Sequence, residues 1–124
     1  AARAVELAVA HKVAVLVNRG SASASEIAAA ALRECGGAVV VGQKTAGAVL
    51  SSTFARLAHG FQLQYPSQDY VTIKGVRLEK HPVVPDAETP ELRRGERDVT
   101  LERAVELLKS ADRAPEIIPM KDAA

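Results

Sequence analysis

The sequence lacks tryptophan, has one cysteine and is only 3% aromatic over 124 residues. Base-stacking platforms for single-stranded nucleic acids need aromatic side chains, so their scarcity argues against one. The 16 basic and 15 acidic residues nearly cancel, which leaves no basic footprint for a nucleic acid partner. The lone Cys35 excludes a disulfide within one chain and a thiolate metal cage. We expect it to be a small buried residue and not a reactive thiol.

Long apolar runs are absent as well. No stretch approaches the roughly 18 residues that a membrane-spanning helix needs, and no signal peptide is visible. The chain begins at Ala1 without methionine, so we expect a fragment of a longer protein, and a missing signal then says nothing about location. The length suits a single domain over 1–124, with an irregular tail over 114–124.

The first half of the chain alternates apolar runs with a helical pattern. A helix is predicted over 2–10, and the β-branched run over 12–18 suits a strand buried on both faces. A turn of small residues leads into a helix over 26–34, which a glycine pair ends. A second buried strand follows over 38–42. This order predicts an α/β fold with a parallel βαβ unit.

The second half predicts antiparallel pieces. A hairpin over 54–73 turns at His59-Gly60, and a shorter one over 71–81 turns at Lys74-Gly75. The proline-rich segment 81–98 should be mostly loop.

Asp98 is predicted to cap a last amphipathic helix over 99–111. Leu101, Val105 and Leu108 share one face of this helix.

Three serines stand on alternate positions just before the helix over 26–34. Ser23 and Glu26 have the spacing of a capping box, which is a complete structural explanation for the serine. The same turn also favours a nucleophile. It lies at the carboxyl end of a strand, and the first amides of the following helix could stabilise an oxyanion. It is not the G-x-S-x-G elbow of ordinary α/β-hydrolases.

Three blocks of the sequence, VAVLVNRGSASASEIAAAAL, AVVVGQKTAG and KGVRLEKHPVVPD, resemble the C-terminal processing (tail-specific) serine proteases. They stand in that family's order and spacing over roughly 12–86, the second half of its catalytic core. The last block departs from the family, which usually has a glycine where Pro82 stands. The resemblance implies a ClpP/crotonase-like core and a polypeptide substrate. It also implies a partner in the upstream half of the same protein, and a location in the cell envelope, periplasm or outside the cell. It leaves a homo-oligomer open and implies no cofactor.

The resemblance also implies roles for the serine turn. Ser23 matches the nucleophile, and the amide of Ala24 matches one oxyanion donor. Ser21 and Ser25 match neighbours without a direct chemical role, and Glu26 matches a residue of the helix start.

One departure concerns the general base. Many members carry a catalytic lysine at the position of Ala48, and a supporting glutamine at the position of Ser52. Alanine cannot move a proton. Lys44 could substitute as an auxiliary base, but a solvated lysine is a poor base at neutral pH. We prefer a histidine from the missing upstream half, as in the lysine-less, tricorn-like branch. Loss of catalysis is the third possibility.

The local histidines are weaker candidates for the base. His11 precedes a strand, His59 lies in the hairpin turn, and His81 lies in the proline-rich loop. Their spacing implies no metal site. Residues 37–45 nearly match the motif of a phosphate-binding loop, but Gln43 interrupts the motif. The four residues between Gly37 and Gly42 also favour a strand.

The resemblance predicts a serine endopeptidase that forms an acyl-enzyme on Ser23. A catalytically inactive peptide- or ligand-binding module on the same scaffold is the alternative, and a crotonase-like acyl-transfer enzyme is a third. The edge of the hairpin over 54–73 could hold an extended substrate, although an ordinary structural hairpin explains that segment equally.

Overall fold

A computed structural model of the chain describes residues 12–93 and 95–110. The helix predicted over 2–10, the tail predicted over 114–124 and His11 lie outside the described residues.

Three parallel strands form the main sheet, in the order β1-β2-β5. Strands β1 (Ala14–Val17) and β2 (Val39–Gly42) come from the two β-branched runs, so both predicted strands and their parallel pairing are confirmed. Strand β5 (Ala87–Glu88) lies inside the segment 81–98, which was predicted to be mostly loop. It has only two residues, and it forms because it pairs with the free edge of β2. No local sequence pattern predicts this pairing.

Helix α2 (Ala24–Gly36) follows β1 and begins two residues before the predicted helix. Alanine and leucine favour the helical conformation. The helix ends where Gly37 adopts a left-handed conformation at φ 62°, and the Ala38 amide returns to the Leu32 carbonyl at 3.1 Å. Cys35 is buried, as predicted.

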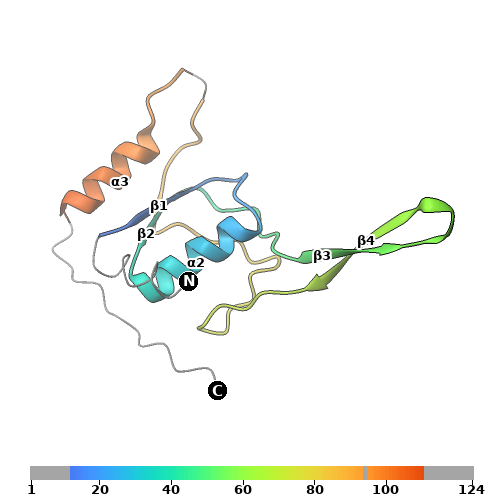
Figure 1. The fold of residues 1–124 in the computed structure, drawn as a ribbon. Coiled ribbons are helices and arrows are strands. Elements are labelled where there is room, and N and C mark those ends of the chain that lie inside the picture. The colour runs from blue at the N-terminus through green and yellow to red at the C-terminus, as the bar shows by residue number, and fades with distance from the viewer. Residues whose placement is uncertain (1–11, 94, 111–124) are drawn as a thin grey trace.

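Helix α3 (Val99–Ser110) contacts β1 and β2, and in Figure 1 these strands lie between α2 and α3. The predicted cap is confirmed, because the Asp98 carboxylate accepts from the Leu101 amide at 2.9 Å. Of the three residues of the predicted apolar face, Leu108 is half-buried and the other two are exposed. Leu101 and Val105 are 51% and 38% exposed, whereas Ala104 is 2% exposed. A small side chain lets the helix approach the sheet closely.

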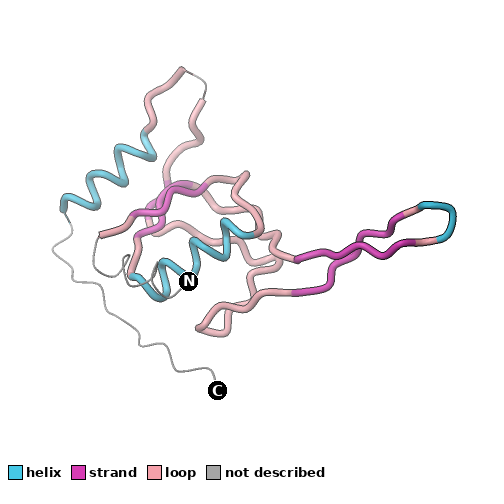
Figure 2. Tube along the Cα trace, in the orientation of Figure 1, coloured by secondary structure: helices cyan, strands magenta, loops and turns pink. Residues whose placement is uncertain are grey.

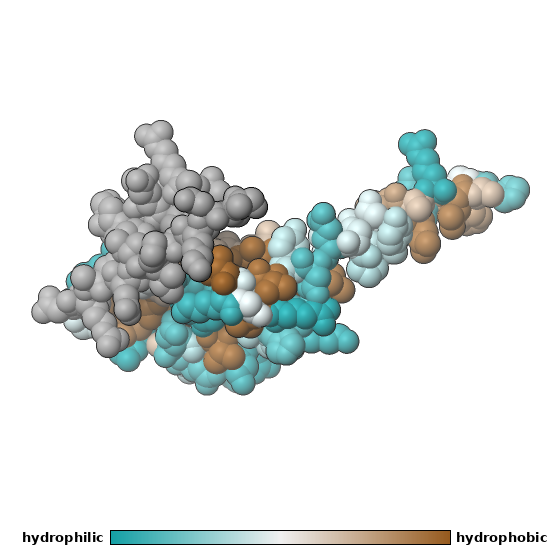
Figure 3. Space-filling model, turned by 90° about the horizontal axis from the view of Figure 1, so that it is seen from below, coloured by the Kyte–Doolittle hydropathy of each residue, from teal (hydrophilic) through white to brown (hydrophobic). Residues whose placement is uncertain are grey.

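Strands β3 (Ser51–Arg56) and β4 (Gln62–Gln68) form the predicted antiparallel hairpin, joined by a 3₁₀ turn over Ala58–Gly60. His59 lies in this turn, as predicted, at φ 59°. The hairpin extends away from the sheet and helices (Figure 2), and apolar side chains lie exposed along it (Figure 3).

The second predicted hairpin, over 71–81, is reduced to a tight turn. The Thr72 amide donates to the Val76 carbonyl at 2.8 Å around Gly75, but one bridge between Val71 and Arg77 replaces the expected strands. The next residue, Leu78, still donates its amide to the Tyr70 carbonyl at 3.2 Å, and its side chain is buried in the core.

The core lies around α2 and the parallel strands. Its buried members are Val17, Ala29, Ala30, Val40, Val49, Leu78 and Val83. All of them except Val49 lie in the three sequence blocks that carry the resemblance, and each block contributes at least one, so one core holds the three blocks together. The part of the chain that the structure describes has no helix long and apolar enough to cross a membrane.

Candidate active site

The serine turn joins the carboxyl end of β1 to the start of α2. Ser23 is the N-cap residue of α2, is exposed, and adopts φ 57° and ψ −126°. An N-cap residue normally lies in the β region. Positive φ is uncommon for a residue with a side chain, and such strained positions are concentrated at functional sites.

Ser23 and Glu26 stand in the predicted capping-box arrangement, but the Ser23 hydroxyl makes no cap hydrogen bond within the described residues. The Glu26 amide donates instead to the Ser23 carbonyl at 3.0 Å. The Glu26 carboxylate accepts from the Ser23 amide at 3.2 Å. The capping box explains why serine and glutamate stand three residues apart. It does not explain the backbone of Ser23, because ordinary capping boxes form from the extended conformation.

The two amides at this turn differ in their partners. The Ser23 amide also donates to the Ala48 carbonyl at 2.8 Å, so it is fully engaged. The Ala24 amide makes no hydrogen bond to any residue that the structure describes. It lies at the positive end of the α2 dipole, directly after Ser23, where an oxyanion donor is needed.

Glu26 is a fully buried carboxylate, 0% exposed. Besides the Ser23 amide, it accepts from the Gly47 amide at 2.7 Å, from the Ala48 amide at 2.9 Å and from the Thr45 hydroxyl. Burial alone raises the pKa of this carboxyl, but the four hydrogen bonds outweigh it and hold the pKa below its ordinary value. The sequence predicted only a helix-start role for Glu26.

Thr45 is a second residue that sequence reasoning missed. It is 5% exposed, donates its hydroxyl hydrogen to Glu26, and accepts from the Val83 amide at 2.8 Å. A lone threonine in a small-residue loop gives no signal of burial, so only the fold reveals it.

Ala48 lies directly against the serine turn, with its carbonyl on the Ser23 amide. Its side chain has no group that accepts a proton. Ser52 lies in β3, where its hydroxyl accepts from Gln64 at 2.6 Å.

Lys44 is exposed. It lines a hollow at the ends of the parallel strands together with Arg19, Glu88 and Glu91. Ser23 is not among the residues of this hollow, so the structure does not bring Lys44 and Ser23 together there.

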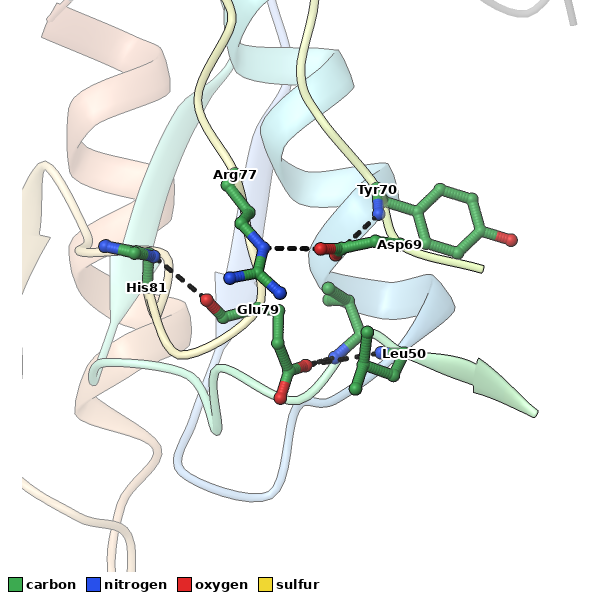
Figure 4. Close-up of polar contacts among 7 residues, drawn as sticks. Leu50, Asp69, Tyr70, Arg77, Glu79 and His81 are labelled. Atoms are coloured by element: carbon green, nitrogen blue, oxygen red, sulfur yellow. Dashed lines mark hydrogen bonds and ion pairs between the residues drawn. The ribbon is translucent and has the colours of Figure 1, made fainter. Parts of the chain in front are cut away.

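The residues just before the proline-rich loop cross the segment that holds Ala48. The Lys80 amide donates to the Gly47 carbonyl at 2.8 Å. The Glu79 carboxylate accepts from the Val49 and Leu50 amides at 3.0 and 3.3 Å, as Figure 4 shows for Leu50. No pattern in the sequence pointed to Glu79.

His81 is exposed, and its Nδ1 lies 2.9 Å from the Glu79 carbonyl oxygen (Figure 4). Because a carbonyl only accepts, Nδ1 is the donor of this bond. The loop does pass close to the serine turn, but no hydrogen bond joins the His81 ring to Ser23 within the described residues.

Two other site types find no support in the geometry. The residues before Gln43 form β2, where a phosphate-binding loop would need an open loop. The Gln43 side-chain amide donates to the Thr89 and Pro90 carbonyls. Within residues 12–93 and 95–110, no three histidine, cysteine, aspartate or glutamate residues are grouped so that they could hold a metal.

The family model described as peptidase family S41 matches residues 2–89, well over half of the chain. The chain belongs to peptidase family S41.

Relatives within the curated proteins are processing peptidases by name. The chain is 39% identical over 74 residues to the chloroplastic C-terminal processing peptidase of Tetradesmus obliquus, covering 60% of this chain and 16% of that protein. It is 34% identical over 100 residues to the carboxyl-terminal-processing protease of a Picosynechococcus species, covering 76% of this chain and 24% of that protein. The chain therefore spans between a sixth and a quarter of the length of these relatives.

The photosystem II D1 C-terminal processing protease has a similar solved structure. The TM-score is 0.61 at 35% identity, with 84% of this chain and 26% of that chain covered. This likeness confirms the predicted α/β class, with a parallel unit and an antiparallel hairpin.

Proposed function

We propose that the protein that carries this chain is a serine endopeptidase of the C-terminal processing type, with Ser23 as its nucleophile. The observation that carries the proposal is the strained, exposed Ser23 at the start of α2, in a chain of peptidase family S41. The substrate class is a polypeptide, as the names of the relatives indicate for those proteins.

The Ser23 hydroxyl attacks the scissile carbonyl carbon, and its proton passes to a general base. The Ala24 amide donates to the oxyanion of the tetrahedral intermediate. Collapse of the intermediate breaks the peptide bond, the protonated base gives its proton to the leaving amine, and the acyl group stays on Ser23. Water then hydrolyses the acyl-enzyme and restores the serine.

The general base lies outside this chain, as does a second oxyanion donor. Ala48 lies against the serine turn and supplies no base. Lys44 lines a hollow whose lining does not include Ser23. A histidine from an upstream part of the protein is the base that this arrangement favours, since imidazole titrates near neutral pH.

The test compares peptide hydrolysis by the intact protein with that by two serine variants. Ser23→Ala should abolish hydrolysis. Ser25→Ala is the matched control, because the Ser25 hydroxyl only donates to the Ala22 carbonyl at 2.6 Å, and it should hydrolyse at close to the wild-type rate. Unchanged hydrolysis by Ser23→Ala would overturn the proposal.

A non-catalytic peptide-binding module is the second candidate, and the alanine at position 48 favours it. A folded intact protein that binds peptides in calorimetry, but neither hydrolyses them nor reacts with a fluorophosphonate, would establish this function instead.

For the protein as a whole we also propose an upstream part that completes the site, and a location in the cell envelope, periplasm or outside the cell. The matched relatives are longer, and one of them is named as chloroplastic. Fractionation of cells that produce the protein, followed by immunoblotting, tests the location.

A further inference from the structure

One buried carboxylate joins three segments that are far apart in the sequence. Glu26 accepts hydrogen bonds from the serine turn, through the Ser23 amide, and from the loop after β2, through Gly47 and Ala48. Thr45 extends this network to the proline-rich loop, because its hydroxyl binds both Glu26 and the Val83 amide.

The network acts directly on the conformation of the nucleophile. The Ser23 amide is held between the Ala48 carbonyl at 2.8 Å and the Glu26 carboxylate at 3.2 Å. The Ala48 amide is held by the same carboxylate at 2.9 Å. Glu26 therefore fixes both sides of the contact that keeps Ser23 at φ 57°, a conformation that persists only where its surroundings impose it.

We propose that Glu26 and Thr45 are positioning residues for the nucleophile: they hold Ser23 in its strained conformation and couple it to the loop at Val83. This inference rests on the proposed peptidase function. Neither residue takes part in the proton transfer itself. Both act through the backbone of the serine turn, so their loss should lower the rate of acylation and leave substrate binding unchanged.

Thr45 offers the cleaner test, because it has two conservative variants. Thr45→Val keeps the shape of the side chain and removes the hydroxyl. Thr45→Ser keeps the hydroxyl and removes a methyl group. Glu26→Gln is the companion variant. All the partners of the Glu26 carboxylate are hydrogen-bond donors, so the amide nitrogen that replaces one oxygen cannot accept from them.

The assay measures kcat and KM for peptide hydrolysis by the intact protein, and the rate of fluorophosphonate labelling per folded molecule. We expect Thr45→Val and Glu26→Gln to lower kcat and the labelling rate at least about tenfold, with KM within twofold. Thr45→Ser should recover most of the loss.

A general loss of stability needs its own control. Ala31→Gly lies on the exposed face of α2, outside the network, and lowers stability through helix propensity alone. It should leave both rates unchanged. If Thr45→Val melts earlier but labels as fast as wild type, the residues are structural and the inference is wrong. If wild type itself neither labels nor hydrolyses, the proposed function fails instead.

Discussion

Glycine and alanine should have opposite effects at two serines that stand two positions apart. Ser23 lies at φ 57° and ψ −126°, where a side chain costs about 1–3 kcal/mol and glycine costs nothing. Relative to alanine, glycine also lowers the free energy of unfolding by roughly 0.4–1 kcal/mol, because it gives the unfolded chain more conformational freedom. The balance favours Ser23→Gly over Ser23→Ala by about 1 kcal/mol in the free energy of unfolding.

Ser25 supplies the matched comparison, because it lies within α2. In a helix, alanine is more stable than glycine by about 1 kcal/mol. The difference between the two variants should therefore reverse in sign: glycine is the more stable at position 23 and alanine is the more stable at position 25.

Urea unfolding of the four variants measures the difference, and both position 23 variants should be inactive. The comparison within each position removes the effect of losing the hydroxyl. If Ser23→Ala is more stable than Ser23→Gly by the same amount as at position 25, Ser23 is not strained. The main structural support for its role would then be lost.

Three further predictions follow from single contacts. Gly42→Ala should destabilise by about 3 kcal/mol in urea unfolding, because the new Cβ would lie 1.9 Å from the Val17 carbonyl oxygen; Gly75→Ala, also at positive φ but in open space, should cost about 1 kcal/mol, and equal losses would contradict the packing. Asp98→Ala should cost about 1 kcal/mol through loss of the α3 cap, and an unchanged unfolding midpoint would show that the cap contributes nothing. The pKa of Glu26 is lowered from 4.5 in the folded protein, so the stability that it contributes is complete above about pH 4.5 and is lost as the pH falls through the lowered pKa; the decline of stability at acid pH should be shallower in Glu26→Gln, and identical profiles would argue against the network.

Local patterns were sufficient to predict most of the regular structure. The β-branched runs became β1 and β2, the alanine-rich segment became α2, and the turn at His59-Gly60 closed the hairpin. Each of these depends on residues that are close in the sequence, and such signals can be read directly.

Two features that the sequence did not predict have a common physical cause. Strand β5 has two residues and exists only because β2 has a free edge. Helix α3 packs through Ala104 because a small residue permits close approach, whereas the larger Leu101 and Val105 stay exposed. Both outcomes depend on what lies on the other side of the contact, and the local sequence does not contain that information.

The candidate site divides in the same way. The serine turn could be predicted from the spacing, and the resemblance singled out Ser23 as the candidate nucleophile. The conformation of Ser23, the burial of Glu26 and the bond from Thr45 to Val83 could not, because they require residues 19 and 38 positions apart in the sequence to meet. The lack of a base at Ala48 was visible in the sequence, and the structure adds that its backbone touches the serine turn.

Mapping of the fluorophosphonate adduct on the intact, folded protein tests the central claim most directly. Mass spectrometry of the digested protein should find the adduct on Ser23, with Ser21 and Ser25 of the same turn unmodified. Inactivation of peptide hydrolysis should follow the extent of labelling. An adduct on another residue, or no adduct on a protein that hydrolyses peptides, would contradict the assignment of Ser23 as the nucleophile.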